Sequence, residues 1–116
     1  MKTTILASAS ALALLAAAPA LAQPGTNTST VNQTGRGGTA TVGQTGSSAT
    51  SAISQGGARN SASVTQSGTG ANSFIQQDNG TGSSDDDNRA TVTQNGDSDS
   101  FVTQVNDGAN ATVDQV

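Results

Sequence analysis

One short frame, Val or Ile followed by any residue and then Gln, recurs eight times along the chain. The steps between successive Val or Ile positions are 11, 11, 11, 11, 17, 10 and 11 residues. A repeat at a nearly fixed period is typical of stacked or solenoidal proteins, in which each unit contacts its neighbours and no single compact core forms. The apolar positions are Val31, Val42, Ile53, Val64, Ile75, Val92, Val102 and Val113, and the Gln positions are Gln33, Gln44, Gln55, Gln66, Gln77, Gln94, Gln104 and Gln115.

The first 22 residues have the features of a signal peptide. Lys2 gives a positive start, residues 5–15 form an apolar stretch too short to span a bilayer, and Ala-Leu-Ala at 20–22 forms a cleavage site. An N-terminal membrane anchor is the alternative, which Pro19 and the cleavage site disfavour. We expect an exported chain with no transmembrane segment after cleavage. Residues 23–26 would be a short leader and residues 27–116 the repeat domain.

Composition excludes several classes of function. Beyond Lys2 the chain has three Arg and eight Asp, a net charge of −5 (3 − 8), and phosphate neutralisation needs a basic patch, so we expect no nucleic acid partner. There is no Cys for disulfides and no Cys or His for a transition metal. Residues 23–116 also have no Lys, Tyr or Glu. We therefore expect no catalytic residue, no metal, no cofactor and no enzyme.

Each repeat reads as a β-strand with one buried face. Counted back from the Gln, position −2 is Val or Ile and position −4 is small, so these three positions share a face, while Thr, Ser and Asn dominate the other. Position −4 alternates without exception between Ser and Ala, which makes the true unit about 22 residues. The series is Ser29, Ala40, Ser51, Ala62, Ser73, Ala90, Ser100 and Ala111.

Turn residues such as Thr34-Gly35 and Thr45-Gly46 directly follow the Gln, and we expect these glycines to supply a positive φ. The predicted fold is an all-β, cross-β solenoid that forms amyloid, built from strand-turn-strand rungs. Each rung folds two strands of five to seven residues so that their Val and Gln faces meet, and rungs stack at about 4.7–4.8 Å. The four rungs are expected at about 27–48, 49–70, 71–97 and 98–116.

The inward Gln needs partners, because a buried amide without them costs a few kcal/mol. In a column each amide can bond to the Gln above and below it, as in the ladders of cross-β stacks. A Gln repeated on the surface by drift is the alternative interpretation.

The residues of the repeat resemble those of a known family. The pattern N-x-[AS]-x-[VI]-x-Q-x-G, present at 60–68 and 88–96, is similar to the curlin repeat, and residues 102–116 are similar to the closing repeat of major curlin subunits. The resemblance covers residues 27–116. It implies a secreted, cell-surface fibre of functional amyloid, made for biofilm matrix and adhesion, that polymerises with itself. It also implies a nucleator subunit and a curli-type outer-membrane secretion pore as partners.

In that family the stacked Gln and Asn side chains are critical for polymerisation, which here implies the eight Gln with Asn27, Asn60 and Asn88. The chain departs from the family in three respects. It has a short leader in place of a Gly-rich one, an insertion around residues 81–88, and other residues at five of the −6 positions. Those five are Gly38, Ala49, Ala71, Ser98 and Ala109.

Two other functions stay open: a minor nucleator of the same fibre, and a monomeric ice- or surface-binding β-solenoid with a flat Thr/Ser face around Thr39 and Thr41. The acidic balance and the tail favour the major subunit. Residues 85–87, three consecutive Asp, are interpreted as a solvated, charge-repelling loop, with a cation site as the alternative. Phe74 and Phe101, both at −3, should face outward and either stack or form a lateral fibre contact.

Overall fold

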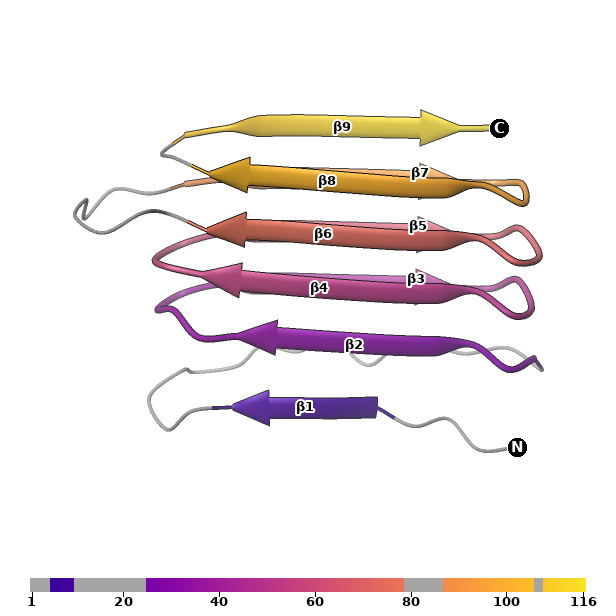
Figure 1. The fold of residues 1–116 in the computed structure, drawn as a ribbon, viewed down its shortest axis with the longest axis horizontal. Helices are drawn as coiled ribbons and strands as arrows, with labels where there is room; N and C mark the ends of the chain where they lie inside the picture. The colour runs from indigo at the N-terminus through magenta and orange to yellow at the C-terminus, as the bar shows by residue number, and fades with distance from the viewer. Residues whose placement is uncertain (1–4, 10–24, 79–86, 106–107) are drawn as a thin grey trace.

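The computed structural model describes residues 5–9, 25–78, 87–105 and 108–116, which form nine strands and no helix. The strands lie in two parallel sheets, ordered β1-β2-β4-β6-β8 and β3-β5-β7-β9, and stack along one axis (Figure 1). The strands are β1 (Ile5–Ala9), β2 (Thr28–Gln33), β3 (Thr39–Gln44), β4 (Thr50–Gly56), β5 (Ser61–Gln66), β6 (Asn72–Asp78), β7 (Arg89–Gln94), β8 (Asp99–Val105) and β9 (Asn110–Gln115).

From β2 onward the chain alternates between the sheets, so two consecutive strands make one rung and each strand pairs with the strand two further along. The registers place like residues in columns: Val31 pairs with Ile53, and Gln33 pairs with Gln55. The Ser column and the Ala column at position −4 are also in register throughout. The predicted all-β solenoid of stacked strand-turn-strand rungs is therefore confirmed, with four rungs and strands of six or seven residues.

The core lies between the two sheets. Burial alternates along each strand, and the predicted Val and Ile residues of the two middle rungs are almost completely buried, from Ile53 at 1% exposed to Val92 at 0%. Val31 and Val113, at the two end rungs, are only partly buried and pack against this core. The apolar cluster between the sheets comes from β2–β9, and the fully buried Ala49 and Ala71 lie directly before β4 and β6.

The glycines after the repeat Gln are required by close packing between turns. A Cβ atom on Gly35 would lie 1.3 Å from the carbonyl oxygen of Gly57, and one on Gly46 would lie 1.7 Å from that of Gly68. Gly35 and Gly46 do not have positive φ, whereas Gly57 does at 86°. The turns were predicted correctly, but the reason given for these two glycines was wrong: the next rung leaves no room for a side chain.

Two expected features fall at or beyond the edges of the described residues. β1 belongs to the segment interpreted as a signal peptide, and it pairs parallel with β2, Ile5 opposite Ser29 and Ala9 opposite Gln33. The edge of β2 therefore accepts a further parallel strand. The proposed cleavage site, and the insertion from residue 81 through 86, lie outside the described residues. Asp87, at the end of that insertion, forms an ion pair with Arg59 at 3.0 Å.

Candidate functional site, the buried glutamine ladders

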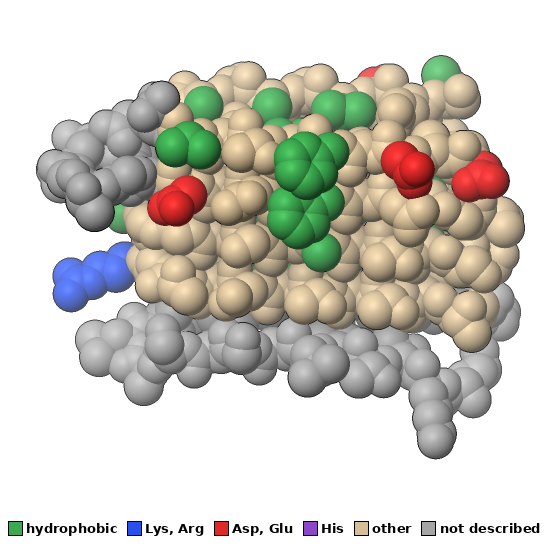
Figure 2. All heavy atoms as spheres, viewed as in Figure 1, with side chains coloured by type: hydrophobic (Ala, Val, Ile, Leu, Met, Phe, Trp, Pro, Cys, Tyr) green, Lys and Arg blue, Asp and Glu red, His purple; other side chains and the backbone are tan. Residues whose placement is uncertain are grey.

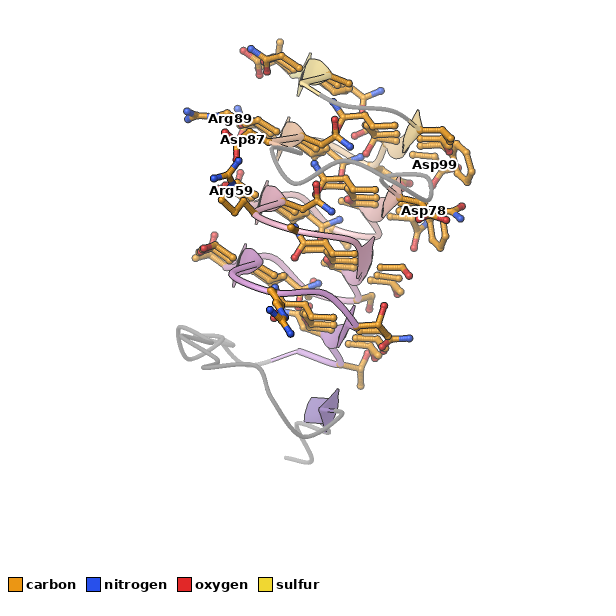
Figure 3. The ribbon with its side chains drawn as sticks, turned by 90° about the vertical axis from the view of Figure 1, so that its left-hand side faces the viewer. Arg59, Asp78, Asp87, Arg89 and Asp99 are labelled. Carbon is orange, nitrogen blue, oxygen red and sulfur yellow. The ribbon has the colours of Figure 1, made fainter. Side chains whose placement is uncertain are left out.

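The strand alternation points the repeat Gln of every rung into the space between the sheets, where they form two columns. Gln66, Gln77 and Gln94 are 0% exposed. Figure 3, which looks along the strands, shows the side chains stacked between the sheets. The sequence prediction of an inward Gln is confirmed, and the interpretation as a surface residue is wrong. One column contains Gln33, Gln55, Gln77 and Gln104, and the other contains Gln44, Gln66, Gln94 and Gln115.

Within each column the amides are hydrogen-bonded in one direction. Gln33 Nε2 donates to Gln55 Oε1 at 2.6 Å, Gln55 donates to Gln77 at 2.8 Å, and Gln77 donates to Gln104 at 2.7 Å. The second column repeats the pattern at 2.9, 2.9 and 3.0 Å. Every donor lies in the earlier rung and every acceptor in the later one, so each ladder has a defined polarity.

The second N–H of these amides joins the two sheets. Gln55 Nε2 also donates to the Thr39 carbonyl oxygen at 3.1 Å, and Gln77 Nε2 donates to that of Ser61 at 3.2 Å. In both cases the carbonyl belongs to the first residue of the strand that precedes the Gln strand. Gln55 and Gln77 thus each donate twice and accept once, which removes the cost of burying an unpaired amide. In the other column, the Nε2 atoms of Gln66 and Gln94 also lie within hydrogen-bond distance of the Ala71 and Ser98 carbonyl oxygens, at 3.1 and 2.8 Å.

The end rungs leave the ladders incomplete. Among the described residues, no group donates to the Oε1 atoms of Gln33 and Gln44 in the first rung. In the last rung, Gln104 and Gln115 donate only to backbone carbonyls, at 3.0 and 3.2 Å. One end of the stack therefore presents amide acceptors and the other presents amide donors.

The three −6 asparagines are buried, at 1–5% exposed, but they bind backbone groups. Asn27 Oδ1 accepts from the Ala49 backbone N–H at 3.0 Å, and its Nδ2 donates to the Gly46 carbonyl at 2.8 Å. Asn88 Oδ1 accepts from the Ala109 N–H at 2.8 Å. The sequence reasoning grouped these residues with the glutamine ladder, whereas the structure shows that Asn27 and Asn88 fasten the turn of one rung to the backbone of the next.

The outer faces of the two sheets differ. Figure 3 places Asp78 and Asp99 outside the β2-β4-β6-β8 sheet, and Arg59, Asp87 and Arg89 on the opposite side. On the β3-β5-β7-β9 sheet, Thr39 is in register with Ser61 and Arg89. This column interrupts the Thr array that an ice- or surface-binding face would need.

Among residues 5–9, 25–78, 87–105 and 108–116, no group of three or more His, Cys, Asp or Glu is placed to hold a metal ion. The same residues contain no helix with the length and apolar character needed to cross a membrane. Comparison with protein-family models, with curated proteins and with solved structures finds no match to this chain.

Proposed function

We propose that this protein is the structural subunit of an extracellular, curli-like fibre of functional amyloid, in which folded subunits stack end to end. The observation that carries the proposal is the complementarity of the two ends of the glutamine ladders. Gln104 and Gln115 have unfilled donors, and Gln33 and Gln44 have unfilled acceptors. A second copy placed on the last rung would continue both ladders without any change in register.

The same placement continues the sheets and the core. β8 of one subunit would lie on β2 of the next, and β9 would lie on β3, with Val102 over Val31 and Gln104 over Gln33. Val31 and Val113, which are only partly buried in a single subunit, would both gain apolar cover. The parallel pairing of β1 with β2 supports this arrangement, because the next subunit's strand would use the same edge of β2.

The resemblance to curlin repeats supplies the setting of the proposal. The protein would be exported behind a signal peptide, pass through a curli-type outer-membrane pore, and grow on the cell surface from a nucleator subunit. The net charge of −5 for residues 23–116 (three Arg and eight Asp) and the similarity of residues 102–116 to the closing repeat of major subunits favour the major role over the minor one. Matrix formation and adhesion would follow from the fibre itself, with no enzyme activity.

The test uses residues 23–116 purified in denaturant and diluted to tens of micromolar. We expect unbranched fibres that bind an amyloid dye and diffract at about 4.7–4.8 Å, and we expect preformed fibres to remove the lag. A soluble monomer that stays dye-negative for days, even with seeds, would refute the proposal. Thermal hysteresis from that monomer would favour the surface-binding solenoid instead.

A further inference from the structure

The chain contains two aromatic residues, and both lie on its surface. Phe74 and Phe101 are the whole aromatic content of 116 residues. They occupy the outer face of the β2-β4-β6-β8 sheet, stacked with ring centroids 5.0 Å apart and an interplanar angle of 10°. Phe101 is 71% exposed. Figure 2 shows the hydrophobic pair standing out from the middle of a largely polar face.

The column that contains the pair has two small and two large members. The registers align Thr30, Ala52, Phe74 and Phe101, one from each rung. An open hollow of about 370 Å³ lies against the rings, bordered by Ala52, Asn72 and Asp99. This hollow lies beside the rings, over β4, β6 and β8. In the −3 column itself, the side chains are large in the last two rungs and small in the first two, so the column is high over β6 and β8 and low over β2 and β4.

In the end-to-end fibre of the proposed function, on which this inference rests, raised and low segments would alternate. Phe101 of one subunit and Phe74 of the next would be three rung steps apart, about 14 Å at the usual strand spacing. A second Phe pair with a centroid separation of 5.0 Å, inserted between them, leaves about 4.6 Å on each side. Aromatic pairs favour centroid distances of about 4.5–7 Å, so the low segment has the height of one Phe pair.

Charge favours the same offset. On this outer face the acidic residues Asp78 and Asp99 belong to β6 and β8, whereas β2 and β4 present Thr, Asn, Ser and Ala. If two such faces paired without an offset, the carboxylates of one fibre would lie close to those of the other and repel them. An offset of two rungs places them opposite uncharged residues.

We propose that this face pairs two fibres of this chain, offset by two rungs, so that Phe74 and Phe101 of each fibre fill the low segment over Thr30 and Ala52 of the other. The partner is a second copy of the chain. One contact buries little area, but it recurs every four rungs, about 19 Å, and the contributions accumulate along the fibre.

The test compares three chains. All lack residues 1–22, and all keep the inward Gln and Val or Ile residues of the core. The parent is compared with Phe74→Thr/Phe101→Thr, which takes the residue already present at position 30 of the same column. The third chain is Thr30→Phe/Ala52→Phe, which adds aromatic surface but fills the low segment. Dye binding reports fibre formation, and electron cryo-microscopy reports the fraction of paired fibres and their separation.

We expect paired fibres from the parent, single fibres at equal yield from the Thr variant, and loss of the parent separation in the filled variant. If the fibres associated only by non-specific hydrophobic contacts, the filled variant, which has more aromatic surface, would bundle at least as closely as the parent. Three outcomes would overturn the inference and leave the proposed function intact: close bundling of the filled variant, paired fibres from the Thr variant, or single fibres from the parent. Absence of any fibre from the parent would overturn both.

Discussion

Two adjacent glutamines on β6 allow a matched test of the ladder, because Gln76 and Gln77 have the same side chain and opposite surroundings. Gln77 is 0% exposed, whereas Gln76 is exposed on the outer face. Gln77 accepts from Gln55 at 2.8 Å and donates to Gln104 at 2.7 Å and to the Ser61 carbonyl at 3.2 Å. Gln77→Ala removes these three hydrogen bonds, and Gln76→Ala leaves the ladder intact.

The expected difference follows from the groups that lose their partners. Gln77→Ala leaves a donor on Gln55 and the acceptor oxygen of Gln104 unpaired in positions that are 3% and 5% exposed. Each unpaired group costs about 1–3 kcal/mol, so the variant should lose about 2–6 kcal/mol per subunit. Gln76→Ala changes only a β-propensity term, which is within about 1 kcal/mol.

If folding is coupled to addition at the fibre end, this loss raises the concentration of soluble subunit at equilibrium with fibres. Since about 1.4 kcal/mol is a factor of ten, Gln77→Ala should raise that concentration by about thirtyfold or more, and Gln76→Ala by about fivefold at most. The assay sediments fibres at the plateau and measures the supernatant by peptide-bond absorbance, because the chain has no Trp or Tyr. Equal increases for the two variants, or a larger one for Gln76→Ala, would show that the ladder does not stabilise the stack.

Three further changes test neighbouring parts of the argument. Gln77→Glu introduces a carboxyl whose buried position raises its pKa above the unfolded value. The variant should therefore assemble efficiently at pH values below about 4, and its assembly yield should fall as pH rises through the folded pKa. An assembly yield independent of pH would contradict this. Gly46→Ala should block assembly, because its Cβ would lie 1.7 Å from the Gly68 carbonyl, whereas Gly43→Ala has nothing within 4 Å and should assemble like the parent. Similar dye time courses for the two glycine variants would show that the turns can separate. Retention of residues 1–22 should slow seeded growth, since β1 occupies the β2 edge, and growth as fast as that of residues 23–116 would show that the edge stays open.

The fold was predictable from the sequence because two periods act on the same residues. The alternation of two fixes which side chains face inward, and the 22-residue unit fixes which strand lies next to which. Once Gln33 lies over Gln55, every other pair in that sheet follows. The one long step, 17 residues from Ile75 to Val92, did not disturb this logic, since the extra residues fall between strands and leave the register of β6 and β7 unchanged.

The polarity of the ladders was not predictable from the sequence. A column of amides can run in either direction, and the choice depends on where the second N–H finds an acceptor. That acceptor is a strand-start carbonyl of the opposite sheet, such as the Thr39 oxygen for Gln55, so it depends on the offset between the sheets. The asparagines were grouped with the ladder for a related reason: their type suggested stacking, but position −6 precedes the strand. There Asn27 lies 3.0 Å from the Ala49 backbone N–H, which it binds.

The places where the repeat is kept and the places where it is broken follow a physical rule. An inward column contacts copies of itself above and below, so a change at one rung disturbs two others, and Gln and Val or Ile persist in all four rungs of both sheets. An outward residue has no such constraint, and the −3 column changes from Thr30 to Ala52 to Phe74. Axial contacts between subunits therefore depend on the inward Gln and Val or Ile residues that all rungs share. A lateral contact that distinguishes one part of the fibre from another must depend on outward residues that differ between rungs. The Phe pair is such a difference, because it gives the outer face of β6 and β8 an aromatic surface that β2 and β4 lack.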